Sequence, residues 1–186
     1  NQLRSIPGWI SRCTGLETLS ATRNQIRIIH ALIYKLTNLK ILDLNYNQIT
    51  LLPKTFGTGL FRLESLSLEH NQLTKLPDTF VQLINLKFLW LSNNQLEVLP
   101  ADFEKLVNLK ILHLPNNRFN TFPSSICRLG KLRRLVLDDN QLTSLPGEIG
   151  ELYNLEELHL GNNQLESLPD EIGQLTNLIQ VKLHGN

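Results

Sequence analysis

The sequence predicts an α/β solenoid with a concave parallel β-sheet and short helical or 3-10 turns on its convex side. Three observations lead to this fold class. Nine asparagines recur in phase, each period contains a strand-like Leu-x-Leu segment or a close variant, and most periods continue with a Leu-Pro segment. The in-phase asparagines are Asn1, Asn24, Asn47, Asn71, Asn94, Asn117, Asn140, Asn163 and Asn186.

The period of the repeat accounts for the whole chain. Successive in-phase asparagines are 23 residues apart, except for one interval of 24 residues. Eight periods plus the closing asparagine use all 186 residues, so we predict one repeat domain over 1–186. The extra residue of the longer period is placed most simply in the segment 56–60, where Gly57 and Gly59 can accommodate a bulge.

The strand half of each period is defined by alternation. In the clearest unit, 155–177, Leu158 and Leu160 point to one side while Glu157, His159 and Gly161 point to the other. One such strand cannot bury its apolar side alone, so stacked turns are expected to form a parallel sheet over a leucine core. The in-phase asparagines are expected to turn inward, because an amide can both donate to and accept from backbone groups of neighbouring turns.

The other half of each period reads LPxxIxxL, as in 168–175. Proline presets φ for the start of a helical turn and has no N–H that needs a partner. Only about seven residues are available, which favours short 3-10 turns over full helices. The second period has His30 where proline usually stands. We expect its segment 28–33 to be a tolerated variant of the solenoid turn, and the alternative is that it forms a different convex segment.

These motifs resemble the leucine-rich repeat family, and the resemblance covers the whole chain. The LxxLxLxxNxLxxLPxxIxxL unit is similar to the 23-residue type found in cytoplasmic Ras-group and Shoc-2-like scaffolds and in bacterial effector-type proteins. The resemblance implies a right-handed solenoid whose concave sheet captures a protein partner, in a scaffold, signalling or effector role.

Composition excludes several other classes. The net charge is +1, from 18 basic and 17 acidic residues, which argues against a nucleic-acid module. No apolar run approaches the ~18 residues of a membrane span. The sequence contains 41 leucines and no methionine, and it opens at Asn1 without a polar capping turn, so we expect a fragment of a longer chain.

The two cysteines, Cys13 and Cys127, lie five turns apart, about 24 Å at ~4.8 Å per turn. A disulfide requires Cα atoms within ~7 Å, so they cannot pair within one chain. We expect Cys13 to fill an inward leucine slot and Cys127 to lie on the convex surface. The 19 asparagines include no Asn-x-Ser/Thr site, and no cysteine-rich cap is present. These features favour a cytoplasmic protein, or one in the host cytosol if it is a delivered bacterial protein.

Function is expected on outward strand positions, where the repeat permits variation. Large apolar side chains cluster there in the middle turns, which marks an interaction site, and tryptophan is enriched among binding hot spots. The alternative is that the aromatic side chains only stack along the sheet for stability. The predicted partner-binding residues are Phe88, Trp90, Ile111, His113 and Val136, with Asp43, Glu69, Arg134 and Asp138 as a polar rim and Tyr46 along the loop edge.

No catalytic, cofactor or metal site is predicted. His113 and His159 share a column but lie two turns apart, at about 9.6 Å, which is too far for one zinc ion without long reach. No nucleophile elbow, phosphate loop or His-Glu-x-x-His motif occurs. We therefore predict a non-enzymatic protein-interaction module. The alternative is the substrate-recruiting arm of a multidomain ligase, kinase or GTPase, and the partner and oligomeric state stay open.

Overall fold

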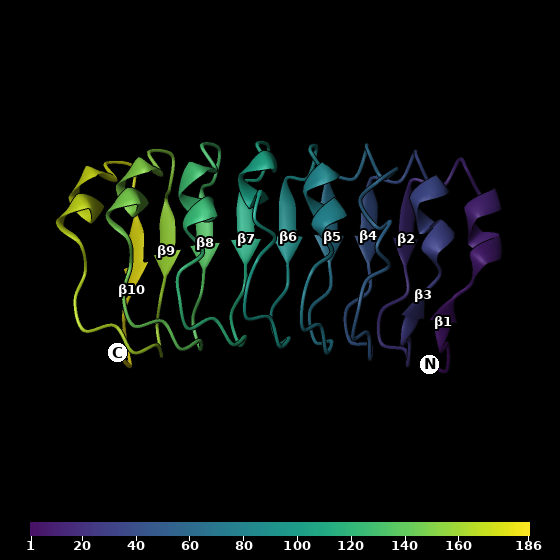
Figure 1. Ribbon diagram of the computed structural model, residues 1–186, viewed down its shortest axis with the longest axis horizontal. Coiled ribbons are helices and arrows are strands. Elements are labelled where there is room, and N and C mark those ends of the chain that lie inside the picture. Colours follow the sequence, from purple (N-terminus) through teal and green to yellow (C-terminus); the bar gives the residue numbers. More distant parts are fainter.

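The computed structural model describes residues 1–186 as a curved solenoid built from one long parallel sheet (Figure 1). Eight strands pair in the order β10-β9-β8-β7-β6-β5-β4-β2, so each strand is hydrogen-bonded to the strand of the next turn. The strands are β2 (Thr18–Ser20), β4 (Ile41–Asp43), β5 (Ser65–Ser67), β6 (Phe88–Trp90), β7 (Ile111–His113), β8 (Arg134–Val136), β9 (Glu157–His159) and β10 (Gln180–Lys182).

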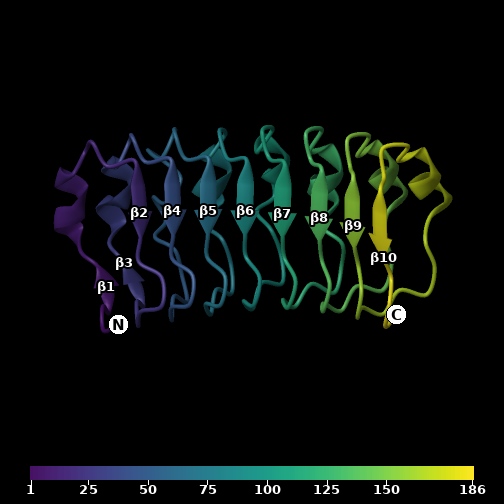
Figure 2. The same cartoon turned by 180° about the vertical axis from the view of Figure 1, so that it is seen from behind.

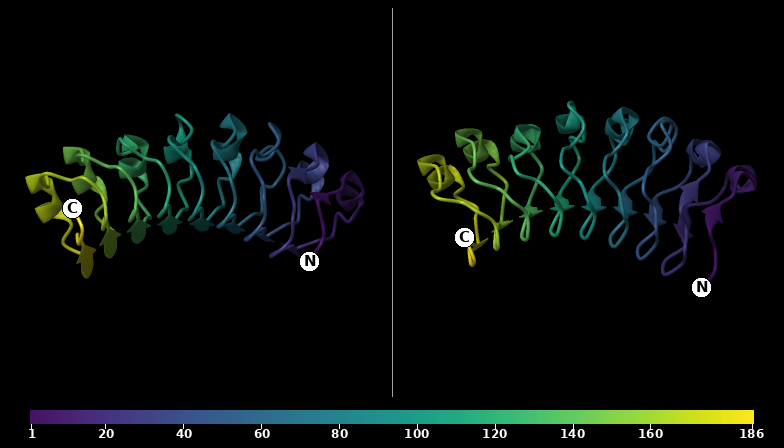
Figure 3. Two further views of the ribbon diagram at one scale, coloured as in Figure 1. Left: turned by 90° about the horizontal axis from the view of Figure 1, so that it is seen from below. Right: turned by 60° about the horizontal axis from the view of Figure 1, so that its bottom comes forward.

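A second, smaller sheet lies beside the first two turns. It pairs β1 (Ser5–Ile6) with β3 (Ile28–Ile29) in parallel (Figure 2). The main sheet forms the inner side of the arc, and the helical turns form the outer side (Figure 3). This arrangement confirms the predicted solenoid with a concave sheet.

Every pairing in the main sheet keeps the period of the sequence. Leu89 of β6 lies in register with Leu66 of β5 and Leu112 of β7, and all three side chains are fully buried. The residues on either side of each such leucine face the concave surface, as the period of two requires. The register therefore places the outward residues of successive turns side by side in columns.

The convex side carries seven 3-10 helices, in agreement with the prediction of short turns. In five of them a proline occupies the N-cap, with φ between −69° and −76°. The helices are η1 (Gly8–Arg12), η2 (Ala31–Lys35), η3 (Asp78–Gln82), η4 (Phe103–Lys105), η5 (Ser124–Arg128), η6 (Gly147–Glu151) and η7 (Asp170–Gln174).

The second turn is a tolerated variant of the repeat, as expected. Although His30 replaces proline, the segment still forms the 3-10 helix η2. The imidazole Nδ1 of His30 accepts a hydrogen bond of 3.1 Å from the Leu32 N–H and so caps a helix end that would otherwise leave a donor free. The alternative of a different convex segment was wrong, because a side-chain cap replaces the proline.

In the third repeat, the convex segment consists of tight chain turns and bends, and no 3-10 helix forms there. The glycines of this segment accommodate the extra residue, as predicted. A Cβ atom at Gly57 would overlap the carbonyl oxygen of Thr79, and one at Gly59 would overlap that of Tyr34. Only glycine permits such close approach of two backbones. The inserted residue therefore lies in the segment where the backbone of the third repeat approaches the backbones of the second and fourth repeats.

The in-phase asparagines form an internal ladder, as expected. The Nδ2 group of Asn94 donates to the Leu68 and Leu91 carbonyls, each at 3.0 Å, and its Oδ1 accepts from the Leu73 N–H at 3.0 Å. Each amide thus satisfies buried backbone groups of its own turn and of the preceding turn. We call this set the asparagine ladder; its buried members are Asn47, Asn71, Asn94, Asn117, Asn140 and Asn163.

Both cysteine expectations were wrong. Cys127 is buried, with 1% of its surface exposed, and it joins the core beside Ile126 from η5. Helix η5 packs between η4 and η6, and burial raises the pKa of the Cys127 thiol to about 12. Cys13 occupies a leucine slot but is exposed, and both thiols are free. No helix of the structure has the length and apolar character needed to cross a membrane.

Candidate protein-binding surface

The middle of the concave sheet carries a group of large side chains on three adjacent strands. Register places Phe88 beside Ile111 and Trp90 beside His113, and the next strand brings Val136 beside His113. We call these five residues the concave patch. The structure therefore brings together the five side chains that the columns of the sequence predict as neighbours.

The two aromatic side chains of the concave patch stack on each other. The rings of Phe88 and Trp90 have centroids 5.9 Å apart and an interplanar angle of 24°. Both side chains and Ile111 are half-buried, so each keeps apolar surface open to solvent. The leucines on the other side of the same strands are fully buried, whereas these side chains lie outside the core.

Val136 contributes less surface than its column position suggests. It lies in register between His113 and His159, and only 6% of its surface is exposed. A short aliphatic side chain between two longer ones on a parallel sheet is covered by them. The open part of the concave patch is therefore Phe88, Trp90, Ile111 and the edge of His113.

His113 is half-buried within the concave patch. Burial, reinforced by the positive charge of Arg134, lowers the pKa of His113 to about 4 from an ordinary value of 6.5. The imidazole is therefore neutral at neutral pH, with one nitrogen as donor and the other as acceptor. Its Nε2 atom is buried and has no hydrogen-bond partner.

Arg134 and Glu157 form an ion pair next to this histidine. Arg134 Nε lies 3.1 Å from Glu157 Oε2, but the N–H lacks the alignment of a hydrogen bond. His159, two turns from His113, is buried and contacts Gln180 Oε1 at 3.0 Å through Nε2. Its Nδ1 lies 3.9 Å from Asp138 Oδ2. No three histidine, cysteine, aspartate or glutamate side chains are arranged to hold a metal ion.

The acidic rim residues hold the loops that follow the strands. Asp43 Oδ1 accepts from the Asn45 N–H at 3.1 Å, and Asp138 Oδ1 accepts from the Gly161 N–H at 2.8 Å. Glu69 Oε1 accepts from Ser92 Oγ at 2.7 Å. Each carboxylate therefore has a structural role, and all three stay half-buried along the edge where the strands end.

Tyr46 belongs to a separate cluster on the loop edge. Its ring stacks on His70 at 4.2 Å and lies 5.3 Å from the guanidinium carbon of Arg23. All three residues have positive φ, between 52° and 55°, at a position that precedes each ladder asparagine. The structure thus places Tyr46 outside the concave patch, within a row of left-handed residues where a tyrosine is unusual.

A hollow of about 280 Å³ opens beside the concave patch, where the strands begin. Phe88 and Ile111 form its apolar wall. Its charged wall consists of Lys110, Arg133, Arg134, Glu156 and Glu157.

Comparison with known proteins agrees with this architecture. A family model described as "Leucine-rich repeat region" matches residues 81–185, and one described as "Leucine rich repeat" matches residues 28–73. The chain belongs to the leucine-rich repeat family. A search of curated protein sequences finds no match.

Solved structures of other leucine-rich repeat proteins superpose along almost the full chain. A leucine-rich repeat protein of Leptospira interrogans is 39% identical with a TM-score of 0.92, covering 100% of this chain and 47% of its own. A plant peptide hormone receptor in complex with RGF2 is 30% identical with a TM-score of 0.83, covering 96% and 30%.

A third solved structure is the leucine-rich repeat domain of a type III effector. It is 25% identical with a TM-score of 0.77, covering 97% of this chain and 73% of its own. Of the Leptospira protein and the plant receptor, by contrast, the present chain spans only about half the length or less.

Sequence reasoning missed Lys110 in this leucine-rich repeat surface. In the sequence, Lys110 stands in a row of charged residues of both signs that precede the strands, and such a pattern favours a solvated row with no binding role. The available signal was three consecutive turns with a cation at that position, namely Lys87, Lys110 and Arg133. Repeated like charge along one column is unfavourable unless something else compensates it.

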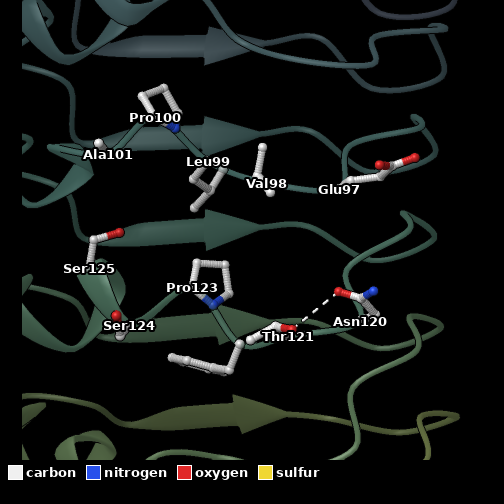
Figure 4. A pocket seen from close by; sticks show the side chains of 11 residues that line it. Glu97, Val98, Leu99, Pro100, Ala101, Asn120, Thr121, Pro123, Ser124 and Ser125 are labelled. Carbon is white, nitrogen blue, oxygen red and sulfur yellow. Dashed lines mark hydrogen bonds between the residues drawn. The ribbon is translucent and has the colours of Figure 1, made fainter.

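Other hollows occur between turns on the flank of the leucine-rich repeat. One of about 350 Å³ lies between the segments 97–101 and 120–125 (Figure 4). Its wall includes the exposed Val98 and the paired Asn120 and Thr121 side chains, at 3.2 Å. It is separate from the concave sheet and brings no cluster of charged groups together.

Proposed function

We propose that this leucine-rich repeat chain is a protein-interaction module that binds a protein partner on the concave patch. The observation that carries the proposal is the Phe88–Trp90 stack, with Ile111 beside it, on the solvent side of a sheet whose other side is filled with leucine. An apolar patch with a polar rim is typical of an interaction site, and tryptophan is enriched among hot spots.

The other turns argue against a purely structural role for the aromatic side chains. At the same two positions, β5 carries Ser65 and Ser67, and β2 carries Thr18 and Ser20. These two strands pair with β4 in the same parallel register, and none of the three carries an aromatic side chain. Since the sheet forms equally well with serine at these positions, aromatic stacking is not needed to build it.

The similarity to a plant peptide hormone receptor supports binding of a polypeptide ligand. That receptor was solved in complex with RGF2 and superposes on 96% of this chain. We extend this kind of activity to the present chain as a scaffold, signalling or effector module, and we assign no catalytic role to it.

We further propose a cytoplasmic location, in the host cytosol if the protein is delivered by a bacterium. The two free cysteines and the lack of an Asn-x-Ser/Thr site fit a reducing compartment. The similarity to the leucine-rich repeat domain of a type III effector supports the delivered alternative.

Affinity capture with quantitative mass spectrometry tests the binding proposal. The chain offers a matched control, because its other tryptophan, Trp9, is 62% exposed on the convex helix η1. The protein captured by the native chain should be lost with Trp90→Ala and with Phe88→Ala and retained with Trp9→Ala. If all three variants retain the same proteins, the concave patch is not the binding site.

A further inference from the structure

The charges that precede the strands form a row of neutralised pairs. Lys40 contacts Glu17 at 2.8 Å, and Lys87 contacts Glu64 at 2.8 Å. The hydrogen bond from Lys40 also lowers the pKa of the Glu17 carboxyl. Farther along the row, Arg133 pairs with Glu156 at 3.3 Å. Each of these cations therefore has an anion on the adjoining turn.

Lys110 is the exception in this row. It makes no ion pair and no side-chain hydrogen bond. Its backbone N–H donates to the Lys87 carbonyl and its carbonyl accepts from the Arg133 N–H, each at 2.8 Å. The two flanking cations are therefore held on the adjoining turns, about 4.8 Å away on either side. Three successive cations with two anions leave one positive charge without compensation.

The residue that carries this uncompensated charge lines the hollow beside the concave patch. Lys110 lines the hollow together with Phe88 and Ile111. The remaining charges of the hollow are already matched, because Arg134 pairs with Glu157 and Arg133 pairs with Glu156. A ligand group entering here therefore meets one free cation next to apolar surface.

We propose that this hollow receives an aspartate or glutamate of the protein partner, paired with Lys110, beside a large apolar side chain that covers Phe88 and Ile111. The inference rests on the proposed function of the concave patch and adds the chemistry of the recognised segment. Charge complementarity identifies the occupant: a purely apolar segment would bury the Lys110 ammonium unpaired, which is costly. A basic segment would be repelled by the uncompensated positive charge of Lys110.

The partner also strengthens the pair that it makes. When an apolar side chain covers Phe88 and Ile111, water leaves the hollow, and the effective dielectric around Lys110 falls. The carboxylate then gains more than an exposed ion pair would, and it also offsets the repulsion among Lys87, Lys110 and Arg133. Recognition of an acidic residue next to an apolar one follows from this joint effect.

The test uses a displayed library of random peptides of about 12 residues, long enough to cross several turns at ~4.8 Å each. Peptides are selected for binding to the native chain, and only those that fail to bind the Trp90→Ala variant are kept for analysis. They should be enriched in Asp or Glu next to Phe, Leu, Ile or Trp. Synthetic copies with Glu→Gln and Glu→Lys are then titrated by fluorescence polarisation.

A charge swap identifies the contact. Lys110→Glu should weaken the binding of the acidic peptides by at least about fivefold and restore the binding of the Glu→Lys copies. The control Lys75→Glu makes the same change of charge on the flank, away from the concave sheet, and should leave both affinities near native values. Recovery of the Glu→Lys peptide by Lys110→Glu also shows that this variant is folded.

The outcomes separate this inference from the proposed function. Peptides that depend on Trp90 but show no acidic preference, and that bind Lys110→Glu as well as native chain, overturn the carboxylate proposal and leave the binding surface standing. A library that yields no peptide dependent on Trp90 or Phe88 overturns both. Equal losses with Lys110→Glu and Lys75→Glu also overturn it, because they indicate only a general charge effect.

Discussion

The asparagine ladder lies in the bends that follow the strands, and the concave patch lies on the outward side of the strands themselves. The two regions follow opposite rules. In the ladder, the same amide makes the same hydrogen bonds in turn after turn, with distances close to 3.0 Å. On the concave face, no two turns carry the same pair of outward residues. A position that repeats serves the turn-to-turn lattice, and a position that varies is free to serve a partner.

The two regions also differ in whether their buried polar side-chain atoms have hydrogen-bond partners. The ladder amides are buried and fully paired. The two buried side-chain nitrogens without a hydrogen-bond partner, His113 Nε2 and Arg134 Nε, both lie at the concave patch. Unpaired polar groups cost stability, so natural proteins tolerate them chiefly where function requires it.

The largest predicted effect concerns the ladder. Asn117→Ala removes two carbonyl contacts of 3.0 Å, to Leu91 and Leu114, and leaves the Leu96 N–H unpaired in the core. Loss of these buried partners should reduce the free energy of unfolding by about 2–4 kcal/mol, as measured by urea denaturation. The exposed Asn120→Ala should change it by less than about 0.5 kcal/mol. A comparable small change for Asn117→Ala would contradict the role of the ladder.

The second-largest predicted effect concerns the concave patch, where a substitution should weaken binding much more than stability. Trp90→Ala should weaken partner binding by about 2 kcal/mol or more, as expected for a central hot spot. The same change should cost no more than about 1 kcal/mol in unfolding free energy, because Trp90 stacks only on Phe88 outside the core. A stability loss as large as that of Asn117→Ala, with binding unchanged, would mean that the aromatic side chains only stabilise the sheet.

A pH-dependent effect should follow from His113. Its pKa in the folded chain, about 4, lies below its ordinary value of 6.5, so the unfolded chain takes up this proton first as the pH falls. The stability due to neutral His113 is therefore complete above pH 6.5 and is lost down to about pH 4. Allowing for solvent screening, the loss should be about 1–2 kcal/mol.

Denaturation at several pH values checks this prediction. Between pH 4 and 6.5, the range defined by the His113 pKa values, His113→Gln should lose less stability than the native chain. Glutamine keeps a polar side chain at this position without titrating in that range. An identical pH dependence for both chains would mean that His113 is solvated in the folded state.

The smallest predicted effect tests the row of ion pairs. Glu64→Gln removes the partner of Lys87, an exposed pair at 2.8 Å, and should change the unfolding free energy by less than about 0.5 kcal/mol. It should, however, tighten binding of the acidic peptides by about twofold, because it adds a second free cation beside Lys110. Unchanged or weaker affinity would limit the charge effect to Lys110 alone.

Periodicity predicted the fold because the repeat fixes both strand register and ladder position. The outward columns, the inward leucines and the proline-capped turns all follow from spacing. Spacing does not determine how much neighbouring side chains cover one another. For that reason Val136 and Cys127, expected at the surface, are buried, and the cap supplied by His30 was not anticipated.

The chemistry of the site was predictable only in part. The aromatic cluster could be recognised because large apolar residues stand at positions that elsewhere carry serine or threonine. The three consecutive cations signal one surplus positive charge, but the sequence does not tell that Lys110 carries it, since this depends on which flanking cation each glutamate joins. Glu64 joins Lys87 and Glu156 joins Arg133, and this choice is set by side-chain geometry.

The most direct test of the central claim, that Trp90 lies at the partner interface, is fluorescence of the intact patch. The chain has two tryptophans, so Trp9→Phe leaves Trp90 as the only one without altering the concave surface. Titration with the captured partner or a selected peptide should shift the emission of Trp90 to shorter wavelength and protect it from acrylamide quenching. Emission and quenching that stay unchanged at saturating ligand would contradict the account.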